Sequence, residues 1–443
     1  MPTAPSRLLR LLTSPVAWHA ASLVAGLAII LWLQRDQWFF FDEFRFLLPD
    51  GPGPWDPHVG HWSLMPTLIY DAYVALFGIN SYWPWALTIT LLHLAVAHLV
   101  WRVCLRAAVA PPIATAAVAV LIVLGSGGEN ILWGFQIGYV GAIAFGMLAF
   151  LLAWDPSRST PRFLAAVGVS VFSLMWSGTS IPLVVATSAV VWWSQGWKRA
   201  LVAAVVPGAI YLTWYALFAV GTGPDTGGFG VQKLFVEMPL FLGVLVVLGF
   251  GAVFPLIVPG VLVVIAVLIW LVPTLRRRDL RVAAAVPLVL AGAAVVFALL
   301  TAYSRASMSV GSGRAGRYVY FVVVLVLPLL AYALTRLLAR YPRRGIPAAI
   351  AALLALSAYQ VVILGLESAR QAQIEQHTHR LVSAALALHA DDPGALDPER
   401  KPDPVWAPDL TLGSLVLLAD AGRIGIGDYT DADRAEALTN LSR

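Results

Sequence analysis

Long apolar runs, each about the length of a membrane-spanning helix and separated by short arginine clusters, most limit what this 443-residue chain can fold into. Hydrophobic residues make up 59% of the chain and charged residues only 12%, about half the charged share of a soluble domain. This composition excludes a soluble globular enzyme, a disordered chain and a disulfide scaffold. The single cysteine, Cys104, cannot form an intrachain disulfide. We therefore expect a lipid bilayer as the solvent.

The net charge of +5 does not indicate a nucleic-acid partner, because the basic residues form several clusters between apolar runs instead of one patch. Such clusters are typical of the cytoplasmic loops of multi-pass membrane proteins. Arg7 and Arg10 precede the first run, at about 16–34, and no small-residue cleavage site follows it. We predict an uncleaved signal-anchor with a cytoplasmic N-terminus in a bacterial plasma membrane.

The apolar runs predict an all-α polytopic membrane protein with about eleven transmembrane helices. After the first span comes an outer loop, 35–82, in which the polar stretch 63–79 predicts a juxtamembrane helix on the outer face. The predicted spans then follow at about 83–101, 110–124, 131–153, 163–178, 180–195, 200–220, 237–272, 282–302, 318–338 and 346–366.

The run 237–272 is long enough for two crossings, but two crossings would place Arg276, Arg277 and Arg278 outside. We therefore expect one crossing plus a re-entrant or interfacial segment, broken near Pro255. The resulting organisation is a transmembrane bundle over 1–366 and a small extracytoplasmic segment over 367–443, which is acidic in places.

Two adjacent carboxylates, Asp42 and Glu43, stand in the aromatic first outer loop. A carboxylate at a dry interface can act as a general base, because partial desolvation raises its pKa. The pair could also hold a divalent metal, Mg²⁺ or Mn²⁺, with a second oxygen ligand. The alternative is that both carboxylates have no chemical role and are simply solvated at the start of a loop just past a helix.

Two histidines, His58 and His61, lie three residues apart in the same loop. They could be metal ligands, but no cysteine or carboxylate set with zinc spacing accompanies them. A hydrogen-bonding role beside the acidic pair and an ordinary interfacial position are the other two interpretations.

Three arginines, Arg305, Arg314 and Arg317, fall on the side of the membrane where positive charge is disfavoured. Guanidinium groups bind phosphate in a bidentate manner, and the glycines among them would let backbone N–H groups reach the same anion. A phosphate at the outer headgroup level is the expected partner. Snorkelling to lipid headgroups is the alternative.

The segment ENILWGFQ marks the outer end of the fourth predicted span. Its polar and aromatic residues could hydrogen-bond sugar hydroxyls, with the indole as a stacking surface, although helix capping and an aromatic belt explain them equally well. These residues are Glu129, Asn130, Trp133 and Gln136.

The predicted spans carry almost no ionisable residues apart from His93 and His98, which we interpret as packed helix-interface residues. A transporter for charged solutes usually keeps charges or broken helices near the membrane midplane. The polar residues here gather instead at the outer ends of the predicted helices. A reaction at the outer surface therefore fits better than conduction.

These motifs resemble the start of the GT-C superfamily of membrane glycosyltransferases, which includes protein O-mannosyltransferases and aminoarabinose transferases. The resemblance rests on the Asp42-Glu43 pair outside the first span, on HWSLMPTLIY from His61 with ALFG after it, and on a span with LLHLAVAHLV. A late Arg317-Tyr318 at the start of a span is also similar. Many bacterial members carry His-Pro-Pro where this chain has HWSLMP. The likeness covers the topology of about 1–366.

The resemblance implies a catalytic carboxylate at Asp42 or Glu43, donor-phosphate contacts at Arg317 and Tyr318, and no required cofactor. It implies transfer of a sugar, with inversion, from a polyprenyl-phosphate donor to an extracytoplasmic glycan, lipid or protein acceptor in cell-envelope biogenesis. Two alternatives remain open. One is a lipid-linked polysaccharide polymerase or ligase without a base carboxylate, and the other is a lipid or polysaccharide transporter.

Overall fold

The structure is a computed structural model that describes residues 14–155, 157–223, 228 and 230–442. Arg7 and Arg10, which support the predicted orientation of the first span, lie outside the described residues. The described chain is helical almost throughout, which confirms the all-α prediction. A two-stranded hairpin interrupts the helices in the loop that follows the first described helix.

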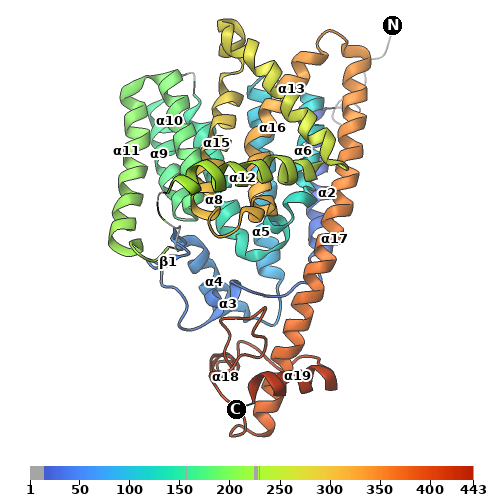
Figure 1. Ribbon diagram of the computed structural model, residues 1–443. Coiled ribbons are helices and arrows are strands. Elements are labelled where there is room, and N and C mark those ends of the chain that lie inside the picture. Colours follow the sequence, from blue (N-terminus) through green and yellow to red (C-terminus); the bar gives the residue numbers. More distant parts are fainter. Residues whose placement is uncertain (1–13, 156, 224–227, 229, 443) are drawn as a thin grey trace.

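The helices stand side by side in a bundle with a smaller lobe at one end (Figure 1). The α-helices are α2 (Pro15–Leu33), α3 (Glu43–Leu47), α4 (Leu64–Phe77), α5 (Trp83–Arg106), α6 (Pro111–Ile122), α7 (Glu129–Leu132), α8 (Ile137–Ala153), α9 (Thr160–Leu174), α10 (Ile181–Gln195), α11 (Trp197–Trp214), α12 (Met238–Val244), α13 (Ile257–Arg276), α14 (Arg278–Ala283), α15 (Ala285–Arg305), α16 (Gly316–Leu338), α17 (Pro342–Asp391), α18 (Leu412–Asp420) and α19 (Asp431–Leu441). The strands are β1 (Pro57–His58) and β2 (His61–Trp62).

Eight helical stretches of the described chain are long and apolar enough to cross a membrane. This finding supports a membrane protein but does not confirm the predicted number of eleven crossings. Three predicted segments correspond to shorter apolar helices, namely α4, α6 and α9. Among the long helices, α8 lies at the centre of the bundle, with 72% of its apolar window buried, whereas α17 lies at the edge with 11%.

The predicted span at 110–124 is cut short after α6, and the chain makes two short turns before α8. The turn η1 (Gly125–Gly127) packs directly against the backbone of α17. A Cβ atom on Gly125 would collide with the backbone nitrogen of Leu364, so only glycine permits this approach. The Gln360 side chain then accepts a hydrogen bond from the backbone N–H of Ser126, at 2.9 Å.

The segment 233–253, which contains α12, runs across the bundle instead of along it, and α13 then rises obliquely toward the end opposite the lobe (Figure 1). The expectation of one crossing plus a re-entrant or interfacial segment stays a prediction, because the stretch Lys233–Val253 is itself long and apolar enough to cross a membrane. π-Helical turns flank α12 on both sides, η5 (Lys233–Glu237) and η6 (Leu245–Gly249). The break before α13 falls at Phe254 and Leu256, which both adopt extended backbone.

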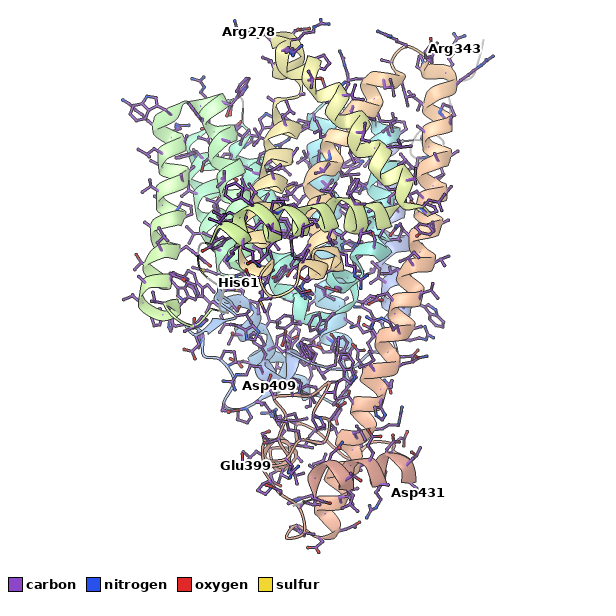
Figure 2. All side chains as sticks on the ribbon, in the orientation of Figure 1. His61, Arg278, Arg343, Glu399, Asp409 and Asp431 are labelled. Carbon is purple, nitrogen blue, oxygen red and sulfur yellow. The ribbon has the colours of Figure 1, made fainter. Side chains whose placement is uncertain are left out.

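The two ends of the molecule differ in charge (Figure 2). Arg278 and Arg343 mark the end where α13 and α17 meet the predicted cytoplasmic loops. The opposite end carries the lobe, with Glu399, Asp409 and Asp431. We call the latter the tail end of the bundle.

The lobe is carried by α17, which continues unbroken past residue 366 to Asp391. Buried polar contacts fix the tail to the end of this helix. The Thr378 hydroxyl donates to the Asp403 carboxylate at 2.8 Å, and Arg380 pairs with Asp433 at 3.2 Å. The tail is therefore packed against the bundle and is not a loose extension.

The histidines within the spans are packed between helices, as predicted. The buried His93 imidazole lies 2.8 Å from the Tyr320 hydroxyl and 3.0 Å from the Ile122 carbonyl. His98 is hydrogen-bonded to His19 at 3.2 Å. Cys104 is buried and free.

Candidate functional site

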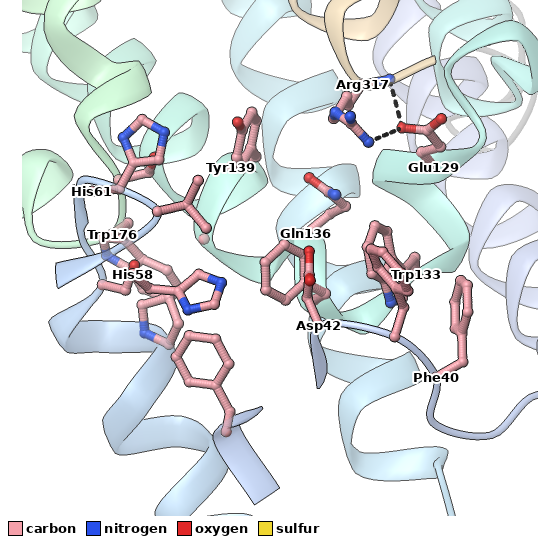
Figure 3. Close-up of a pocket in the computed structure, with 18 of the residues that line it drawn as sticks. Phe40, Asp42, His58, His61, Glu129, Trp133, Gln136, Tyr139, Trp176 and Arg317 are labelled. Atoms are coloured by element: carbon pink, nitrogen blue, oxygen red, sulfur yellow. Dashed lines mark hydrogen bonds and ion pairs between the residues drawn. The ribbon is translucent and has the colours of Figure 1, made fainter. Parts of the chain in front are cut away.

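A cavity of about 310 Å³ lies at the tail end of the bundle. It is enclosed by the loop 35–82, here called the first loop, by α7, α8 and α17, and by the tail. It brings together eight of the twelve predicted site residues, from segments far apart in the sequence. They are Asp42, His58, His61, Glu129, Trp133, Gln136, Arg305 and Arg317. Figure 3 shows the Asp42 carboxylate between the histidine pair and the Trp133 indole.

Asp42 and Glu43 have opposite surroundings although they are adjacent in the sequence. The Glu43 side chain is fully buried beneath the cavity and accepts hydrogen bonds from the Tyr70 hydroxyl at 2.8 Å and the Tyr82 hydroxyl at 3.0 Å. Burial raises the pKa of Glu43 to about 8, so the carboxyl is mostly protonated at pH 7. Tyr82 is itself held by the backbone N–H of Gly134, at 2.6 Å.

Asp42 is half-buried and faces the cavity. It occupies the position before α3 where a carboxylate commonly caps the helix, yet its side chain makes no cap hydrogen bond. Within the described chain this carboxylate has no hydrogen-bond or ion-pair partner. Burial and the charge of Asp409 raise its pKa, while Arg317 and Arg305 oppose the shift.

The backbone before Asp42 is strained. Phe41 has φ of 56°, a left-handed conformation that is costly for a bulky side chain. Its N–H donates to the Trp406 carbonyl in the tail, at 2.5 Å. This hydrogen bond between the first loop and the tail thus keeps Phe41 in its strained conformation. The conformation in turn directs the Asp42 side chain into the cavity.

The two histidines occupy facing positions of the hairpin, since His58 is paired with His61 in the antiparallel register. Facing residues project to the same side of a hairpin, so both imidazoles line the cavity. Burial lowers the pKa of each to about 4, with Arg45 adding to the shift of His58 and Arg305 to that of His61. Both rings are therefore neutral at pH 7. Among the described residues, no three or more His, Cys, Asp or Glu side chains form a group that could hold a metal ion.

Arg317 is held in place by Glu129. The two side chains form an ion pair at 3.2 Å, and the Glu129 carboxylate also accepts from the backbone N–H of Arg317 at 3.3 Å. The Asn130 amide donates to the Arg317 carbonyl at 3.2 Å and lies outside the cavity wall. Arg305 also lines the cavity but has no carboxylate partner within the described residues, so its charge remains available.

Two other predicted phosphate contacts do not line this cavity. Arg314 is exposed on η8 (Val310–Arg314), and Tyr318 is buried and faces a neighbouring cavity. Gly313, which we expected to help bind an anion, packs so closely on α12 that an added Cβ would lie 2.7 Å from the Phe241 carbonyl oxygen. Close packing is therefore enough to explain why this position is glycine.

The neighbouring cavity, of about 270 Å³, shares His61, Tyr139 and Arg305 with the first. Its other walls are largely apolar and come from α10, α11 and α15. Leu300 on this wall is 46% exposed on the outer surface of the bundle. An apolar chain could therefore lie beside α15 with a polar head at Arg305.

Several buried polar atoms around the main cavity lack a hydrogen-bond partner within the described part of the chain. Among them are the His58 Nε2, the Gln136 Oε1 and the Trp176 Nε1 atoms. Buried polar atoms in folded proteins are normally hydrogen-bonded, so these atoms are free to bind the hydroxyl groups of a ligand. Trp133 stacks on Phe135 at 4.8 Å and forms an aromatic wall beside them.

The sequence analysis missed the residues that the tail and α17 contribute. Trp406 closes the cavity and lies 6.2 Å from the Phe40 ring. Glu367 and Arg370 on α17 form an ion pair at 2.6 Å on the cavity wall. The one available signal was a tryptophan in an otherwise polar, proline-rich stretch.

The sequence matches no family model, and searches of curated proteins and of solved structures find no significant match.

Proposed function

We propose that this protein is an integral membrane glycosyltransferase that transfers a sugar, with inversion, from a polyprenyl-phosphate donor to an extracytoplasmic acceptor. The observation that carries the proposal is the unengaged Asp42 carboxylate in one cavity with Arg305 and Arg317. The tail end, opposite Arg278 and Arg343, is then the extracytoplasmic face.

In the proposed reaction, Asp42 takes the proton from an acceptor hydroxyl as its oxygen attacks the anomeric carbon. The bond from that carbon to the phosphate oxygen breaks, and the phosphate leaves with the electron pair from the opposite face. Arg305 and the Arg317–Glu129 pair stabilise the charge that develops on the phosphate. A positioned base of this kind contributes ~10²–10⁴-fold in rate.

The donor would lie with its phosphate at Arg305, where the two cavities meet, and with its prenyl chain beside Leu300. The sugar would then occupy the main cavity, where His58, Gln136 and Trp176 offer unpaired polar atoms. Glu43 would act as a positioning residue, because its carboxyl group fixes two tyrosines beneath the cavity floor.

The test compares donor binding and turnover by purified protein in lipid. We expect Asp42→Asn to bind polyprenyl-phosphate sugar normally but to lose ~10²–10⁴-fold in transfer rate. Asp36→Asn is the matched control, because Asp36 lies in the same loop but is exposed and paired with Arg35. Glu43→Gln, which mimics a protonated carboxyl group, should retain most activity.

Full activity in Asp42→Asn would refute the base assignment and favour a polymerase or ligase without a base carboxylate. If the wild-type protein neither binds nor uses any polyprenyl-phosphate sugar, the glycosyltransferase proposal is wrong and a transporter becomes the better hypothesis.

A further inference from the structure

A separate cavity of about 560 Å³ lies on another side of the bundle, where α2 ends, α5 begins and α17 passes. Its volume falls within the range of small-molecule sites, roughly 300–1,000 Å³. It shares no lining residue with the Asp42 cavity. Tyr82 forms part of its wall and, through its hydroxyl, contacts Glu43 under the other cavity.

Gln37 in this wall is the feature that points to a ligand. Its side chain is only 5% exposed, yet neither the amide nitrogen nor the amide oxygen has a hydrogen-bond partner among the residues that the structure describes. Leaving a buried donor and a buried acceptor unpaired is unfavourable, so such groups normally have a partner. A ligand that both donates and accepts at one place would satisfy both atoms.

The neighbouring polar groups favour an uncharged ligand. Arg35 is already paired with Asp36 at 3.1 Å. The Gln34 amide is bonded to the carbonyls of Ile131 and Leu132, at 3.2 and 3.0 Å. The pocket therefore offers amide, hydroxyl and imidazole groups but, within the described residues, no arginine or lysine without an acidic partner. Hydroxyl groups, which donate and accept, match this set better than a phosphate does.

The position of the cavity favours a ligand with an apolar part. Leu31 and Leu87, near the tail ends of the α2 and α5 spans, line its inner side. Trp83 at its rim is 54% exposed, as expected for a residue of the aromatic belt at the membrane surface. A molecule in the pocket would thus have its polar part at the headgroup level and its apolar part in the hydrocarbon layer.

We propose that this cavity binds the sugar headgroup of a neutral glycolipid in the leaflet at the tail end, with Gln37 hydrogen-bonded to two of its hydroxyl groups. The proposal goes beyond the glycosyltransferase function, because the site contains neither Asp42 nor the arginines of the other cavity.

The experiment measures lipid retention by native mass spectrometry on the full chain released from phosphatidylcholine vesicles. The vesicles contain either monoglucosyl diacylglycerol, diacylglycerol or phosphatidylglycerol with the same acyl chains. We expect the wild type to retain the glucosyl lipid above the other two. Gln37→Leu should lower that retention about tenfold without lowering the melting temperature, since no hydrogen bond within the protein is lost.

Gln373→Leu on the exposed face of α17 is the matched control, and Gln136→Leu reports on the Asp42 cavity. Gln373→Leu should retain the glucosyl lipid as the wild type does. Loss of retention in Gln136→Leu but not in Gln37→Leu would place the lipid in the Asp42 cavity and overturn the proposal. Ser81→Phe, a change at an exposed rim position, should block the cavity if Gln37→Leu does not fold. Free methyl glucoside in excess should compete weakly, which separates a lipid ligand from a soluble sugar.

Equal retention of glucosyl lipid by the wild type, Gln37→Leu and Ser81→Phe would overturn the proposal. A preference for phosphatidylglycerol would overturn the neutral headgroup, and full competition by methyl glucoside would overturn the lipid anchor. None of these outcomes depends on catalysis, so they are distinguishable from failure of the Asp42 test.

Discussion

At the scale of single residues, burial divides the acidic pair into two chemical roles. Glu43 has its oxygens occupied by two tyrosines and a backbone N–H, and it is mostly protonated at pH 7. It therefore adds little negative charge next to Asp42. Asp42 instead faces the cavity with no hydrogen-bond or ion-pair partner among the described residues, which leaves its carboxylate oxygens accessible, as a base requires.

The raised pKa of Asp42 predicts the pH dependence of transfer. The base acts when deprotonated, so kcat/KM should fall as the pH drops through a pKa above the usual 3.8. Arg305 lowers this pKa, so Arg305→Gln should move the midpoint to higher pH. The histidines of the cavity, with pKa values of about 4, should give no inflection near 6.5. A pH–rate profile tests all three expectations.

A fall in kcat/KM below about pH 6.5 in the wild type that disappears in His58→Gln would contradict this assignment. It would transfer the role of base from Asp42 to the imidazole.

At the scale of elements, the hairpin positions both histidines by means of a tight turn. Val59 and Gly60, its two central residues, have φ of 50° and 76°. Two-residue hairpins need such positive values, and Asn-Gly suits them best. Valine is branched at Cβ and is strained in this conformation.

Val59→Asn should therefore stabilise the protein by about 1 kcal/mol and leave the His58–His61 register unchanged. Thermal unfolding in detergent should show a higher melting temperature than the wild type. Val59→Thr, which keeps the branched Cβ, is the control and should show no gain. A lower melting temperature in Val59→Asn would mean that the valine side chain contributes more by packing than it costs in strain.

Helix periodicity and arginine clusters predicted most of the elements, because both depend on local sequence. The positions of α9, α10 and α15 agree with the predicted spans to within a few residues. The shortening of α6 was not predictable, since it depends on the contact of Gly125 with α17, more than 200 residues later.

The candidate site was predictable in part, for a similar reason. Residue type selected Asp42, His58 and Arg305 as separate candidates, and the structure brings them to one cavity. Which of Asp42 and Glu43 faces the cavity depends on the backbone turn at Phe41 and on two tyrosines, one in α4 and one just before α5. Trp406 was missed because only the packing of the tail brings it to the first loop.

At the scale of the whole molecule, the separation of charge predicts the orientation in the membrane. A Cys104→Ala background removes the only native thiol, which is buried. Single cysteines placed at Glu399 or Asp431 should react with a membrane-impermeant maleimide added to intact cells. Cysteines at Arg278 or Arg343, at the opposite end, should react only after permeabilisation. Reaction of the second pair in intact cells would invert the topology and move the cavity to the cytoplasm.

The length of α17 has a consequence for how the bilayer acts on the cavity. An unbroken helix of 50 residues is about 75 Å long, far more than the roughly 30 Å hydrocarbon core. The first half of this helix carries the predicted span 346–366, and the tail that follows its second half includes Trp406. A thinner bilayer that tilts α17 would move the Trp406 indole away from the first loop. We therefore expect lipid thickness to control access to Asp42.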